Sequence, residues 1–225
     1  MYKMVQYRKT NKAFEEKTKE IQEMVEKGEP SFSTKTKDHK EFHEKEGVNI
    51  RHLQEKYPDI IGWIRIPGTN IDYPIAQGKD NLFYLHHDYK GEKDPLGTVF
   101  MEVENQPDFQ DQNTILYGHN VKSGKIFHEL HHYRDPAFLP NAPIIEISHV
   151  DGISRYKIFA AYLANPEDNF RLPHYTDKEF ETFYQRILDA NRLKETLPSS
   201  FDHILTLQTC SSGNKRLVIH GYKMD

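Results

Sequence analysis

The sequence predicts a mainly β protein with added helices, in which about eight strands close into a barrel. From residue 60 onward, short runs rich in β-branched and aromatic residues alternate with turn-forming residues, as in an all-β domain. Helical spacing of apolar residues is confined to the first 60 residues and to residues 177–190. We therefore expect N-terminal helices, a barrel, and one helix between its sixth and seventh strands.

The composition excludes several classes of protein. Of the 225 residues, 36% are hydrophobic and 28% are charged, and no run of about 18 apolar residues could span a membrane. The net charge of −4 gives no basic field for nucleic acid. The single cysteine excludes an intramolecular disulfide and a multi-cysteine zinc site. A globular domain with at most one reactive thiol remains.

The N-terminal part, residues 1–48, is predicted to be a charged helical arm, and residues 49–225 the barrel domain. Within the first 50 residues 21 are charged. Phe14, Ile21 and Met24 recur at helical spacing and predict a solvated amphipathic helix over residues 12–27. A second short helix is expected over residues 49–57, before Pro58.

The barrel strands follow in order, and the first two form a hairpin-like pair around the turn at residues 67–70. The short links between most strands favour antiparallel pairing. The predicted strands are residues 61–66, 71–75, 98–101, 113–117, 142–148, 155–163, 203–209 and 216–224.

The helix predicted over residues 177–190 has its own signals. Phe180, Phe183 and Ile187 share one face at helical spacing, and Thr176 is a suitable N-cap.

Cys210 is the first candidate for chemistry. It ends the β-prone run 204–210 and precedes a polar, glycine-containing loop, so the strand delivers the thiol to the rim of the sheet. A lone cysteine is more often a buried packing residue.

A thiol nucleophile needs a proton partner, and the sequence has 13 histidines. His203 lies seven residues back on the same strand, roughly 23 Å away. In a hairpin around residues 211–215, His220 pairs near Thr206, roughly 13 Å from the thiol. Both are interpreted as structural.

His119 and Arg216 fit better. The strand 114–117 leads through Gly118 directly to His119, which therefore lies at a strand end. The same hairpin places Arg216 opposite Cys210, where its fixed charge could bind a carbonyl oxygen as negative charge develops.

These residues resemble the sortases, and class B most closely. The resemblance covers roughly residues 50–225. One departure is the loop between Cys210 and Arg216, which has five residues and is shorter than is common in that family. The resemblance is carried by TLQTC at 206–210, KR at 215–216, YGHN at 117–120, IGWIRIPGTNIDYPI at 61–75 and QGKDNLFYL at 77–85.

The resemblance implies a cysteine transpeptidase that cleaves a C-terminal sorting signal of secreted proteins through a Cys210 thioacyl intermediate. His119 would be the general acid and base, and Arg216 would hold the substrate or its oxyanion. The acyl group would pass to an amine of a cell-wall cross-bridge or stem peptide. The family residues that line the signal groove match Asn81, Leu85, Tyr117, Gln208 and Thr209, although a core role is an alternative for Leu85 and Tyr117.

The resemblance also implies no cofactor, no metal and no nucleic acid, and we expect a monomer. Family members act on the outer face of the cell membrane of Gram-positive bacteria, held by an N-terminal anchor. The first residues here have no apolar core, so we expect that such an anchor has been truncated.

Two alternatives remain. His128-Glu129-Leu130-His131-His132 matches the H-E-x-x-H spacing of a zinc hydrolase, with His128 and His132 as ligands, although Pro136 and Pro140 would end a helix there. We interpret it as a polar surface turn, and residues 86–88 as surface residues. The other alternative is a non-catalytic binding module that keeps the barrel.

Overall fold

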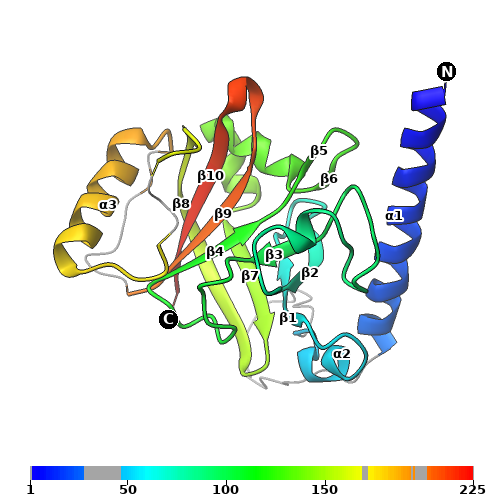
Figure 1. Cartoon of the computed structure of the whole chain (residues 1–225). Coiled ribbons are helices and arrows are strands. Elements are labelled where there is room, and N and C mark those ends of the chain that lie inside the picture. Colours follow the sequence, from blue (N-terminus) through cyan, green and yellow to red (C-terminus); the bar gives the residue numbers. More distant parts are fainter. Residues whose placement is uncertain (1, 28–46, 169–171, 194, 196–201, 225) are drawn as a thin grey trace.

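The chain folds around a closed barrel (Figure 1). The computed structural model describes residues 2–27, 47–168, 172–193, 195 and 202–224, and within them eight strands are hydrogen-bonded in the order β1-β2-β3-β4-β9-β10-β8-β7. The helices and strands are α1 (Tyr2–Lys27), α2 (Ile50–Lys56), β1 (Ile60–Arg65), β2 (Asp72–Ala76), η1 (Phe83–Leu85), β3 (Val99–Met101), β4 (Asn113–Tyr117), β5 (Asn120–Val121), β6 (Lys125–Ile126), η2 (His128–Arg134), η3 (Pro136–Asn141), β7 (Ile144–His149), β8 (Gly152–Ala164), α3 (Asp177–Ala190), β9 (Ile204–Cys210), η4 (Ser212–Asn214) and β10 (Arg216–Lys223).

The eight-stranded closed barrel confirms the predicted fold class, but the prediction of antiparallel pairing is wrong at two places. β2 pairs with β3 in parallel, and so does β4 with β9. Parallel neighbours need a long crossover, and the segments between these strands are long enough to provide one. The β5–β6 hairpin was not predicted, because two residues per strand leave no periodic pattern.

The barrel interior is filled by apolar side chains from facing strands. Ile64, Ile75, Leu116, Leu207 and Ile219 are all fully buried there. At about 25 cal/mol per Å² of apolar surface, these strands stabilise the barrel without any disulfide. The barrel is therefore a rigid frame whose strand ends can hold functional groups.

Helix α1 lies along one side of the barrel, opposite α3 (Figure 1). It begins at Tyr2 and not near residue 12, because nothing in its first turns breaks a helix and Asn11 donates a hydrogen bond from Nδ2 to the carbonyl of Tyr7 at 2.8 Å. Phe14 and Ile21 are buried, so the helix is docked and only partly solvated. Among the described helices, none is long and apolar enough to cross a membrane.

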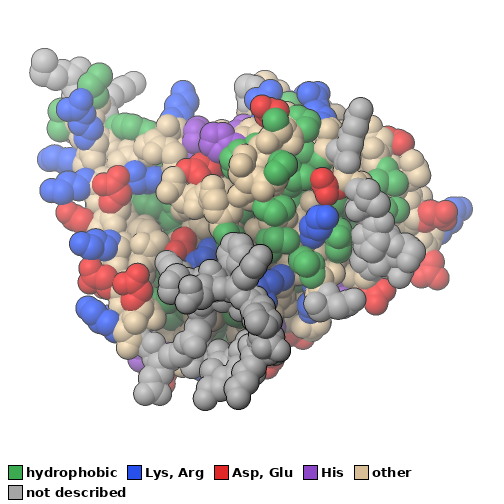
Figure 2. All heavy atoms as spheres, turned by 180° about the vertical axis from the view of Figure 1, so that it is seen from behind, with side chains coloured by type: hydrophobic (Ala, Val, Ile, Leu, Met, Phe, Trp, Pro, Cys, Tyr) green, Lys and Arg blue, Asp and Glu red, His purple; other side chains and the backbone are tan. Residues whose placement is uncertain are grey.

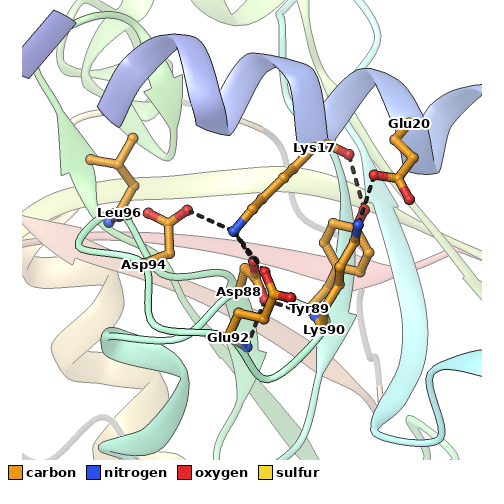
Figure 3. Close-up of polar contacts among 8 residues, drawn as sticks. All are labelled: Lys17, Glu20, Asp88, Tyr89, Lys90, Glu92, Asp94 and Leu96. Carbon is orange, nitrogen blue, oxygen red and sulfur yellow. Dashed lines mark hydrogen bonds and ion pairs between the residues drawn. The ribbon is translucent and has the colours of Figure 1, made fainter. Parts of the chain in front are cut away.

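The contact of α1 with the loop after η1 is polar and partly buried (Figure 3). Lys17 points between three carboxylates, bonding Asp88 and lying 3.4 Å from Glu92 and 3.8 Å from Asp94. Burial disfavours the charge of Lys17, but its hydrogen bond with Asp88 and the attraction of the carboxylates outweigh this cost and raise its pKa. Asp88 is buried, so its interpretation as a surface residue is wrong.

Helix α3 confirms the prediction for residues 177–190. Thr176 caps it, and Glu179 completes a capping box with the Thr176 backbone. Phe183 and Ile187 are buried against the outer face of β8 and β10.

Candidate active site

Cys210 is the last residue of β9, and its side chain is exposed. β9 lies between β4 and β10 in the barrel, and its preceding residues Leu205, Leu207 and Thr209 are buried. The frame thus fixes the backbone that carries the thiol, while the thiol itself faces solvent.

Arg216 opens β10 directly opposite Cys210, as the hairpin register predicts. The turn between them is tight: Gly213 and Asn214 both have positive φ, 64° and 58°, a conformation these two residue types tolerate best. The guanidinium is half-buried and makes a long hydrogen bond of 3.4 Å to the Lys215 carbonyl. No carboxylate of the described residues lies within ion-pair distance of it, so its charge is available to a ligand.

His119 follows β4 after Gly118. The Gly118 N–H donates to the Gln208 carbonyl at 3.2 Å, which ties this segment to β9. A Cβ on Gly118 would lie 2.7 Å from the Phe127 ring, so glycine is required by the close approach. His119 Nε2 donates to the Leu85 carbonyl at 2.7 Å, which leaves Nδ1 as the nitrogen that can exchange a proton.

The three side chains share one open groove with a volume of about 490 Å³. All eight site residues named from the sequence line it: Asn81, Leu85, Tyr117, His119, Gln208, Thr209, Cys210 and Arg216. Strands and loops far apart in the sequence therefore meet at one end of the barrel.

Glu102 is a groove residue that the sequence reasoning missed. It follows β3 directly, and its carboxylate accepts hydrogen bonds from the Asn81 side chain and, at 2.5 Å, from the Tyr117 hydroxyl. A charged residue at the end of an apolar strand was the available signal. Glu102 holds Asn81 and Tyr117 in place at the groove.

Several polar atoms beside Cys210 are buried without a hydrogen-bond partner among the described residues. These are Gln208 Oε1, Thr209 Oγ1 and Ser211 Oγ. Buried polar atoms are almost always paired. Gln208 and Thr209 line the groove, but these particular oxygens have almost no exposed surface.

His203 and His220, which the sequence analysis interprets as structural, do not line the groove. His220 pairs with Thr206 in the β9–β10 register, as predicted, and is fully buried. Burial lowers its pKa to about 3. His203 Nδ1 bonds the Asp111 carbonyl at 3.1 Å, at the far end of β9.

The H-E-x-x-H segment forms the 3₁₀ helix η2 and not an α-helix. In a helix of three residues per turn, His128 and His132 do not share a face. His128 bonds Asn120, whereas the His132 ring lies against Phe138. Within the described part of the chain, no group of three His, Cys, Asp or Glu side chains could hold a metal ion. The segment is also no plain surface turn, because Leu130 and Tyr133 are fully buried.

Comparison with known proteins gives one answer. Residues 64–224 match the sortase domain. Sortase B of Listeria monocytogenes is 38% identical over 76% of this chain and 72% of its own length. A sortase B–substrate complex from Staphylococcus aureus superposes with a TM-score of 0.74 at 30% identity, covering 78% of this chain and 84% of that one. Sortase B from B. anthracis gives 0.80 at 26% identity over 96% and 98%.

The residues matched to the sortase domain include all the groove residues named above, and the resemblance inferred from the motifs is confirmed. The chain belongs to the sortase family, as a class B cysteine transpeptidase.

Proposed function

We propose that Cys210 is the nucleophile, His119 the general acid and base, and Arg216 the residue that binds the reacting carbonyl. The observation that carries this assignment is their position in one groove, on three strand ends of a rigid barrel. A thiolate is the reactive form of cysteine, and Cys210 is exposed to the substrate side.

In the first half-reaction the Cys210 thiolate attacks the Thr carbonyl carbon of a sorting signal. The carbonyl oxygen becomes negative, and the guanidinium of Arg216 stabilises it. The C–N bond then breaks, His119 gives its proton to the departing amine, and a thioester to Cys210 remains.

In the second half-reaction an amine of a cell-wall peptide attacks the thioester. His119 takes the proton of that amine, the C–S bond breaks, and Cys210 leaves as thiolate. A sortase B of 29% identity has been solved in complex with triglycine, which supports a glycine-like amine as acceptor here.

We further propose that Asn81, Leu85, Tyr117, Gln208 and Thr209 bind the sorting-signal peptide. Gln208 and Thr209 lie on β9 directly before Cys210 and line the same groove, so a peptide bound at the thiol would lie beside them. Glu102 fixes Asn81 and Tyr117 against the same groove. The enzyme would act as a monomer on the outer face of a Gram-positive cell membrane, held by an N-terminal anchor.

The test is cleavage of a set of fluorogenic sorting-signal peptides, with and without triglycine. We expect cleavage of at least one peptide and, with triglycine, a ligated product that the Cys210→Ala variant does not form. Cleavage that is equal in Cys210→Ala would overturn the proposal.

A further inference from the structure

The H-E-x-x-H segment and Asn120 hold the backbone of Cys210. The carbonyl oxygen of Cys210 accepts two side-chain hydrogen bonds, from Asn120 Nδ2 at 3.0 Å and from His131 Nε2 at 3.1 Å. The N–H of the same peptide bond, on Ser211, donates to the Lys215 carbonyl at 2.9 Å. The peptide plane that follows the thiol is therefore held at both ends.

The donors themselves are oriented. His128 Nδ1 lies 2.7 Å from Asn120 Oδ1, and because an amide oxygen only accepts, His128 donates. This contact turns the Asn120 amide so that its NH₂ faces Cys210. Burial lowers the pKa of His131, so its ring is neutral near pH 7 and carries its proton on Nε2 when it donates to the carbonyl.

The base of this arrangement is rigid. η2 is anchored by the fully buried Leu130 and Tyr133, and the Tyr133 hydroxyl donates to the Ala142 carbonyl at 2.6 Å. Glu129 accepts a hydrogen bond from the Asn70 N–H at 2.8 Å. Figure 2 shows histidine side chains gathered at the edge of the molecule in the view from behind.

We propose that Asn120 and His131 are positioning residues that fix the direction of the Cys210 thiol, with His128 orienting Asn120. This inference rests on the proposed role of Cys210. Both residues bond the carbonyl and not the thiol, so each acts through the backbone. Releasing the carbonyl would let the strand end rotate, and a displacement of about 1 Å at a reacting atom can cost about 100-fold in rate.

The lone cysteine allows a direct readout that does not depend on turnover. Protein labelled with [1-¹³C]cysteine gives one carbonyl signal, that of Cys210. Loss of a hydrogen bond to that oxygen should move the signal upfield in Asn120→Ala and in His131→Phe. His131→Gln keeps a donor at the position of Nε2 and should keep the signal.

Steady-state kinetics of the same variants are measured with the sorting-signal peptide that the wild-type enzyme cleaves fastest. We expect kcat to fall about 10- to 100-fold in Asn120→Ala and His131→Phe, with KM within about twofold and Tm little changed. His131→Gln should recover most of kcat. His132→Ala is the matched control, because His132 lies on the same helix and its ring lies against Phe138.

An unmoved carbonyl signal in both variants would overturn the proposal. So would a His131→Gln variant as slow as His131→Phe, or a loss confined to KM or matched by a fall in Tm. Turnover that persists in Cys210→Ala would instead overturn the proposed function, while the carbonyl signal still decides whether the contacts exist.

Discussion

The middle of the β9–β10 hairpin and the end at its turn differ in how their polar groups are used. Near the middle, His220 bonds the Tyr162 hydroxyl at 2.9 Å and the Thr206 hydroxyl at 2.9 Å, and Thr206 donates to Asn113 at 2.6 Å. At the turn end, Cys210 is exposed and the oxygens of Gln208 and Thr209 have no partner among the described residues.

The same pair of strands therefore holds a buried hydrogen-bond network in its middle and the reactive groups at its turn. In the middle, Thr206 donates to Asn113, so it accepts from His220 Nδ1–H, and Nε2 then accepts from Tyr162. That closed network requires a neutral ring. Four residues further along β9, the same ladder leaves a thiol and a guanidinium free to meet another molecule.

The largest expected effect is that of Cys210→Ala. Cleavage of sorting-signal peptides should be abolished, because no other thiol exists in the chain. Tm should stay within a few degrees, since the side chain is exposed. Retained peptide turnover, measured by fluorescence release, would contradict the thiol mechanism.

His119→Ala comes next. We expect the rate to fall by about 10²–10⁴, the usual loss for a general acid and base. His203→Ala is the matched control at the other end of the strand and should keep its rate. An equal loss of rate in a folded His203→Ala variant would contradict the assignment of His119 as the catalytic histidine.

Substitution of Arg216 is a third test of the groups at the turn end of the hairpin. Removing a donor to a developing oxyanion costs about 10²–10³ in kcat, so Arg216→Ala should lose that much. Arg216→Lys keeps the charge but not the planar fork, and should recover part of the activity. Equal rates in Arg216→Ala and wild type would remove Arg216 from the mechanism, and a collapse of Tm would make it structural.

The smallest expected effect is the pH dependence of stability that comes from His220, in the middle of the hairpin. The unfolded chain protonates His220 below about pH 6.5, whereas the folded site excludes the proton until about pH 3. The unfolded state then holds the extra proton, so the free energy of unfolding should fall with decreasing pH, by up to about 1.4 kcal/mol per unit.

Urea unfolding at several pH values between 4 and 6 measures this slope. The His220→Gln variant lacks the group, so its slope should be smaller than that of wild type by about one proton. Identical slopes would mean that the hydrogen-bond network around His220 does not exclude the proton.

The sequence could predict the parts of the site that depend on local register. Counting residues back from the turn places Arg216 opposite Cys210 and His220 opposite Thr206, and the structure has both pairs. The capping box of α3 is equally local. His119 was recognisable because a glycine separates it from the end of a strand.

The remainder depends on contacts between distant segments. The burial of Asp88 requires Lys17 of α1, 71 residues away. The bond from His131 to the Cys210 carbonyl joins residues 79 apart. Residues 128–132 were interpreted as a polar surface turn, with a zinc site as the alternative, because nothing local in the sequence shows that Leu130 and Tyr133 of the 3₁₀ helix η2 are buried.

The most direct test of the account is the covalent intermediate on Cys210. The enzyme is mixed with the fastest sorting-signal peptide without an amine acceptor, quenched with acid, and examined by intact mass and peptide mapping. We predict a mass increase equal to the acyl fragment, located on Cys210 and lost when triglycine is added. Cleavage with the adduct on another residue, or with no adduct while Cys210→Ala remains active, would contradict the account.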